Sequence, residues 1–155
     1  MIQRIQTVYL LIAAILVGTL CIVPLAHGIA SDAISYPVSI WGFVNRTPSP
    51  DSYSGSWLNL AAGFVSIITA ILAIVTIFLY KKRILQKKLC HILLVLLILL
   101  CVTLVAYLVQ TSALFEGFKL SVICAFPIIA FIMIILARKG IIHDEKLVRS
   151  LDRIR

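Results

Sequence analysis

Acidic residues are scarce in this chain. Among its 155 residues, six are Asp or Glu and fourteen are Lys or Arg, which gives a net charge of +8 at neutral pH. Charged residues of both signs make up 13% of the chain, whereas 62% of it is apolar and the mean hydropathy is +1.12. An average soluble domain has about 25% charged residues. The composition therefore excludes an ordinary soluble domain.

Motifs for catalysis and metal binding are also lacking. The sequence has no nucleophile and base at a catalytic spacing, no zinc motif and no phosphate-binding glycine loop. His27 follows the first apolar stretch, whereas His91 begins the third and His143 follows the fourth. On the topology derived below, a hydrocarbon core separates His27 from the other two, which excludes a bis-histidine haem between the spans. We expect no catalytic residue, no cofactor and no metal site.

The four cysteines do not form a C-x-x-C pair, which argues against a thiol redox centre. They are Cys21, Cys90, Cys101 and Cys124. All four lie within or at the ends of apolar stretches, where cysteine acts as a small packing residue. A disulfide between Cys21 and Cys124, which are expected at similar depth, remains open.

Four long uncharged stretches dominate what the sequence does contain. They cover residues 5–25, 57–80, 89–109 and 120–137, and none includes Asp, Glu, Lys or Arg. Each has roughly the 17–25 residues with which a helix crosses a bilayer. The sequence predicts an all-α membrane protein, in which residues 1–155 form one domain, a four-helix transmembrane bundle. Pro127, inside the fourth stretch, predicts a kink in that helix.

Basic residues are concentrated in alternate gaps between these stretches. Twelve of them flank the first stretch at its start, fill the second gap or follow the last stretch, and only Arg46 and Lys119 lie elsewhere. Short loops rich in Lys and Arg stay in the cytoplasm. Both termini are therefore expected there, with residues 26–56 as an outer loop and residues 138–155 as a cytoplasmic tail. This distribution explains the positive charge without nucleic acid.

The first stretch has a rival interpretation as a cleaved signal peptide. Gly28, Ile29 and Ala30 form a small-x-small triplet after the apolar run. The run is longer than a typical signal core, and a single Arg precedes it, so an uncleaved anchor fits better.

Small residues recur at helical spacing in the first two stretches. The candidate packing residues are Ala14, Gly18, Ala62, Ser66 and Ala70. Small faces let helix backbones approach closely, which matters because lipid offers no hydrophobic drive for helix association. Packing within the bundle, against another protein or against a second copy in a homo-oligomer all remain open.

The outer loop contains one strand pattern. Apolar and other residues alternate over residues 36–44, and turn formers fill residues 45–51. We expect a short β-hairpin that caps the bundle, with a weak second strand at residues 52–56.

The tail has the pattern of an amphipathic helix over residues 144–155, with Asp144 as its N-cap. Apolar side chains would share one side of this helix and basic side chains another. We expect the tail to contact anionic lipids of the inner leaflet or a membrane-protein partner. The candidate contact residues are Lys146, Leu147, Arg149, Leu151 and Arg153.

The two ends of the chain carry a family resemblance. Residues 1–11, MIQRIQTVYLL, and residues 144–155, DEKLVRSLDRIR, resemble an uncharacterised bacterial family of small four-span proteins, classed as a domain of unknown function. The basic loop at residues 81–83 resembles it more weakly. The resemblance implies a bacterial inner membrane and four uncleaved spans, and it implies no activity, substrate or catalytic residue.

Three function classes follow. The first is a non-enzymatic integral membrane protein that serves as a small subunit, scaffold or assembly partner of an inner-membrane complex. The second is an oligomeric carrier or pore for a small or lipid-like solute, although the four stretches lack the ionisable residues that carriers usually place inside the membrane. The third and weakest is a membrane enzyme, since Asp32, Asp51 and Glu116 are scattered over the outer loops.

Overall fold

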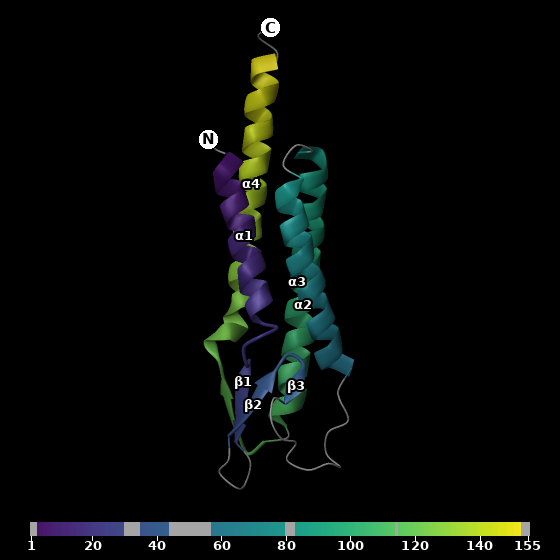
Figure 1. Ribbon diagram of the computed structural model, residues 1–155, viewed down its shortest axis with the longest axis vertical. Helices are drawn as coiled ribbons and strands as arrows, with labels where there is room; N and C mark the ends of the chain where they lie inside the picture. The colour runs from purple at the N-terminus through teal and green to yellow at the C-terminus, as the bar shows by residue number, and fades with distance from the viewer. Residues whose placement is uncertain (1–2, 30–34, 44–56, 80–82, 114, 153–155) are drawn as a thin grey trace.

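Four α-helices account for most of the structure. The computed structural model describes residues 3–29, 35–43, 57–79, 83–113 and 115–152 (Figure 1). Within these ranges the helices are α1 Gln3–Thr19, α2 Trp57–Phe78, α3 Arg83–Ser112 and α4 Phe126–Asp152, and the 3-10 turn Val122–Ala125 precedes α4. The prediction of a mostly helical chain is confirmed.

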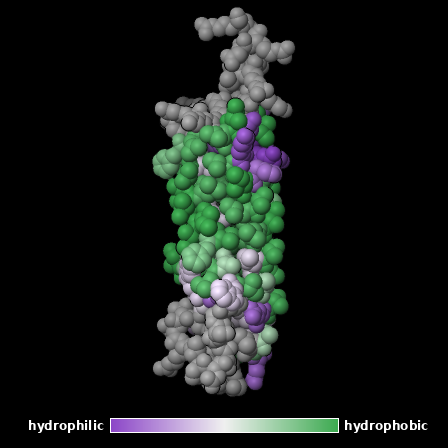
Figure 2. Space-filling view, turned by 90° about the vertical axis from the view of Figure 1, so that its right-hand side faces the viewer, coloured by the Kyte–Doolittle hydropathy of each residue, from purple (hydrophilic) through white to green (hydrophobic). Residues whose placement is uncertain are grey.

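Three of these helices are long and apolar enough to cross a membrane. The apolar segments are Trp57–Phe78 in α2, Ile84–Ser112 in α3 and Val122–His143, which includes the 3-10 turn and most of α4, whereas α1 has the shorter apolar segment Ile5–Thr19. Figure 2 shows a broad hydrophobic band over the middle of the helices, with hydrophilic side chains gathered toward its two ends. Helix length and surface both fit a membrane protein.

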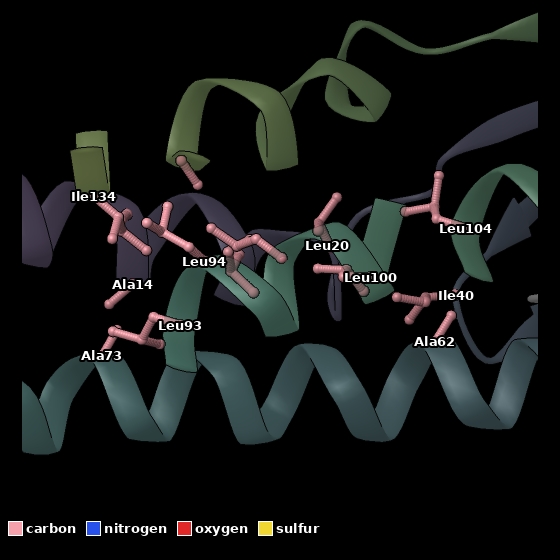
Figure 3. Close-up of a cluster of buried hydrophobic side chains, with 14 of the residues drawn as sticks. Ala14, Leu20, Ile40, Ala62, Ala73, Leu93, Leu94, Leu100, Leu104 and Ile134 are labelled. Atoms are coloured by element: carbon pink, nitrogen blue, oxygen red, sulfur yellow. The ribbon is translucent and has the colours of Figure 1, made fainter. Parts of the chain in front are cut away.

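The helices surround one apolar core. Each packs against two neighbours, α1 against α2 and α4, and α3 against α2 and α4. Side chains from all four helices meet in the core, and Ala62 and Ala73 project toward it from α2 (Figure 3). The largest fully buried side chain is Tyr107 of α3, whose hydroxyl donates a 2.9 Å hydrogen bond to the carbonyl oxygen of Ser39.

A small antiparallel sheet covers one end of the helices, which we call the sheet end. Its strands are β1 Ala26–Ile29, β2 Ser35–Ser39, β3 Gly42–Phe43 and β4 Gly117–Leu120, in the order β3-β2-β1-β4. Both chain termini lie at the opposite end, which we call the terminal end (Figure 1). A β-hairpin lies in the predicted outer loop as β2 and β3, but it turns at Ile40 and Trp41 rather than at the predicted residues 45–51, and Gly42 supports this turn with a φ of 121°.

The remaining strands differ from the prediction. β1 and β4 were not predicted, and β4 comes from the connection between α3 and α4 rather than from the predicted outer loop. The alternating pattern over residues 36–44 is interrupted because the chain turns at Ile40 and Trp41. Ile40 is fully buried in the core, so its apolar character serves helix packing rather than a strand face. The weak strand predicted at residues 52–56 lies outside the described residues.

Two predicted spans have different boundaries in the structure. α1 ends at Thr19, short of the predicted end at residue 25, and the chain turns there before β1. The predicted fourth span begins at residue 120, which belongs to β4, and its helix begins at Phe126. The predicted kink at Pro127 is wrong, because Pro127 occupies the first turn of α4, where the missing N–H costs no helical hydrogen bond.

Trp41 attaches the hairpin turn to α2. Its indole Nε1 donates a 3.0 Å hydrogen bond to the Cys21 carbonyl oxygen, and its own carbonyl oxygen accepts a 3.1 Å bond from Nδ2 of Asn59. Its ring lies against Gly63, where an added Cβ would be 2.5 Å from Cζ3 of Trp41. Any larger residue at this point of α2 would therefore force the indole of Trp41 or the helix to shift.

We expect Gly63→Ala to lower the free energy of unfolding by about 1–3 kcal/mol, because the methyl group would meet the rigid indole. Gly18→Ala is the matched control, since a Cβ at Gly18 would meet no atom within 4 Å. Alanine favours a helix over glycine, so this control should be neutral or stabilising by up to about 1 kcal/mol. Thermal unfolding in mild detergent measures both, and equal tolerance would contradict the contact between Trp41 and α2.

Candidate functional site

The inner face of α2 consists of small and polar side chains. Its buried residues are Asn59, Ala62, Gly63, Ser66, Thr69, Ala73 and Thr76. The opposite face exposes large apolar side chains, among them Phe64 at 59%, Ile71 at 56% and Phe78 at 74%. A soluble protein buries its large apolar side chains, so this reversed distribution is typical of a helix whose outer face meets lipid.

The hydroxyl groups of this inner face donate hydrogen bonds to carbonyl oxygens of α2 itself. Ser66 Oγ donates to the Gly63 carbonyl oxygen at 2.8 Å, Thr69 Oγ1 to that of Val65 at 2.7 Å and Thr76 Oγ1 to that of Leu72 at 2.7 Å. Serine and threonine commonly make such bonds to the preceding helical turn. The inner face therefore packs closely without polar partners from another molecule.

The predicted packing residues differ in how deeply they are buried in the structure. Ala62 and Ser66 are fully buried and Ala14 is 6% exposed, whereas Ala70 is only partly buried against the core. Gly18 has open space beside it. Two glycines within the helices make tight contacts that were not predicted, Gly63 against Trp41 and Gly140 against Gln6. Neither glycine belongs to a predicted small-xxx-small pair, so residue spacing in the sequence did not identify these two contacts.

The tail continues α4. The helix runs without a break to Asp152, so the prediction that Asp144 is an N-cap is wrong, because that residue lies deep within a helix that begins at Phe126. Helical backbone over the predicted contact segment is present up to Asp152. The side chains of the candidate contact residues Lys146, Leu147, Arg149 and Leu151 lie outside the described part, and so does Arg153 altogether.

A basic groove lies between α3 and α4 toward the terminal end. It has a volume of about 680 Å³ and is lined by Lys87, Lys88, His91, Ile92, Arg138 and Ile142. These residues were not predicted as a site, since the basic residues of the two segments indicate only topology in the sequence. The signal that could have found the groove was the pairing of α3 with α4, which brings the two basic segments together.

The cysteines and histidines do not assemble a reactive centre in the described part of the chain. All four cysteines are free thiols. Sγ of Cys124 donates to the Leu25 carbonyl oxygen at 3.0 Å, and Sγ of Cys21 lies 3.0 Å from Oγ of Ser66. Among the described residues, no group of three His, Cys, Asp or Glu side chains could hold a metal ion.

Substitutions on the two faces of α2 and α3 test this arrangement. We expect Ser66→Leu to lower the free energy of unfolding by about 1–3 kcal/mol, since the larger side chain has no room at a fully buried position. Ala70→Leu should have a smaller effect, and Ile98→Phe should be nearly silent because Ile98 is 54% exposed. Melting temperatures in detergent rank the three variants, and a silent Ser66→Leu would show that the faces are assigned wrongly.

Comparison with known proteins gives a family and no activity. A search of curated proteins finds no match to this chain. A family model covers residues 2–154, nearly the whole sequence, and its description is "Domain of unknown function (DUF4293)". The chain therefore belongs to the DUF4293 family, a domain of unknown function.

Proposed function

We propose that this protein is a non-enzymatic integral membrane protein that serves as a small subunit, scaffold or assembly partner of a bacterial inner-membrane complex. In this proposal its four helices form a transmembrane bundle with both termini in the cytoplasm. The observation that carries the partner role is the length of α4. Its apolar segment ends at His143, yet the helix continues to Asp152 and projects beyond the other helices at the terminal end (Figure 1).

The membrane placement is supported by length and charge. Three helices reach spanning length, and α1, with 17 residues, is about 26 Å long at 1.5 Å per residue, close to the thickness of a hydrocarbon core. The described parts of α1, α3 and α4 at the terminal end carry Arg4, Arg83, Lys87, Lys88, Arg138, Lys139, Lys146 and Arg149, whereas Lys119 in β4 belongs to the sheet end (Figure 1). The positive-inside rule then assigns the terminal end to the cytoplasm.

The projecting part of α4 favours a contact role. A single helix of this length in water gains little stability by itself, so it is expected to pack against something. The sequence places Leu147 and Leu151 on its apolar side and Lys146 and Arg149 on its basic side. The local bonding of the α2 hydroxyl groups supports close packing, and it favours an assembly role over a polar path for a solute.

Topology can be tested with reporter fusions. Reporters after Leu85 and after Arg155 should indicate the cytoplasm, and one after Ser49 should indicate the periplasm. A periplasmic result at Arg155 would overturn the four-span arrangement. The mass of the intact chain tests the signal-peptide alternative, because a mature protein that begins near Ser31 would prove cleavage.

The contact role of α4 can be tested by removing residues 144–155 while keeping Arg138 and Lys139 for orientation. We expect a stoichiometric partner, identified by co-purification in mild detergent and mass spectrometry, to be lost from the truncated protein. Leu147→Asp should give the same loss, because it places a charge on the apolar side of the helix. Ser150→Asp adds the same carboxylate away from the centre of the apolar side. This variant should still co-purify with the partner.

Two outcomes would contradict this role. Full retention of the partner after truncation would reduce residues 144–155 to a topology signal. A homogeneous homo-oligomer without another protein would favour the carrier or pore instead. Unchanged reporter signals in each variant show that topology is intact, so a loss of partner cannot be attributed to misinsertion.

A further inference from the structure

The basic groove between α3 and α4 combines charge with apolar surface. α3 contributes Lys87, Lys88, His91 and Ile92, and α4 contributes Arg138 and Ile142. Two or more cationic groups that converge from different helices suit a phosphate, because arginine can bind two phosphate oxygens at once and lysine adds a compact charge. The volume of about 680 Å³ is within the range of small-ligand sites.

An apolar track leads from the groove along α3. Ile92 lines the groove, and Val95, Leu99 and Val102 follow it at helical spacing with 55%, 47% and 61% of their surfaces exposed. A soluble phosphate compound would use the cations and leave this track uncovered. A molecule with a charged head and an apolar chain would use both.

We propose that this groove binds the phosphate headgroup of an anionic phospholipid, with an acyl chain lying along the exposed face of α3. The proposal rests on the transmembrane placement described above, on which the groove lies at headgroup depth in the cytoplasmic leaflet. Anionic lipids of that leaflet attract basic side chains near the surface. The groove differs from a diffuse basic surface because its cations converge from two helices on one volume.

Native mass spectrometry of the full-length protein tests this site. The protein would be purified in mild detergent and titrated with dioleoyl phosphatidylglycerol or, separately, with dioleoyl phosphatidylcholine. We expect one phosphatidylglycerol to be retained in preference to phosphatidylcholine. The double variant Lys88→Gln, Arg138→Gln should bind phosphatidylglycerol at least about tenfold more weakly, because each basic residue at an anionic surface contributes substantially to lipid affinity.

The control removes the same charge elsewhere. The double variant Lys119→Gln, Lys139→Gln changes two exposed cations that do not line the groove, and it should retain the lipid. Equal weakening in both double variants, or equal retention of the two lipids by the unmodified protein, would overturn the site. Full competition by soluble glycerol 1-phosphate would overturn the lipid as its occupant and assign the groove to a soluble phosphate compound.

A separate experiment tests the membrane placement without depending on lipid selectivity. Carbonate extraction of cell membranes shows whether each variant remains an integral protein. A protein that is extracted would refute the transmembrane placement, whereas one that stays in the membrane without selecting phosphatidylglycerol would refute the lipid site alone.

Discussion

Close approach of helices through small side chains is the constraint on which the rest of this structure depends. In a bilayer, large apolar side chains gain little by leaving lipid for the protein interior, so helices associate through van der Waals contact. α2 satisfies this constraint by burying Ala62, Ser66 and Ala73 and turning its large apolar side chains outward. Because the buried side chains of α2 are small, this helix can approach both α1 and α3 closely. The four helices then enclose one core.

The sheet end imposes a second constraint, since backbone groups that leave a helix must find partners nearby. Leu25 shows how this is met: its N–H donates to the Val38 carbonyl oxygen at 2.7 Å, and its own carbonyl oxygen accepts from the N–H of Ser121 at 2.9 Å. The bond from Ser121 joins the connection after α1 to the connection before α4. With the bond from Tyr107 to Ser39, the bonds of Leu25 tie segments from both halves of the chain into one cap.

Much of the helical architecture could be predicted from the sequence, because uncharged stretches and small-residue spacing are local signals. Ala62 and Ser66 were found this way. β4 could not be predicted, since four residues between two apolar stretches become a strand only when β1 offers its edge. Pro127 was misread because an apolar run does not mark where its helix begins. Gly63 and the basic groove depend on contacts between segments distant in sequence, with Trp41 and with α4, which no local pattern encodes.

The two ends of the molecule differ in how they are held. At the sheet end, backbone hydrogen bonds cross between connections, so the helices are fixed to one another there. At the terminal end, the described links include side-chain contacts, such as the 3.3 Å bond from Gln86 Nε2 to the Thr76 carbonyl oxygen and the packing of Gly140 on Gln6. α1 and α4 approach closely at that contact, while α3 and α4 leave the groove between them. Because Arg138 lies on the same helix as the segment that projects to Asp152, a lipid held in the groove would place its charge beside the proposed partner-binding surface. The sheet end thus sets the spacing of the helices, and the terminal end presents the surfaces available for binding.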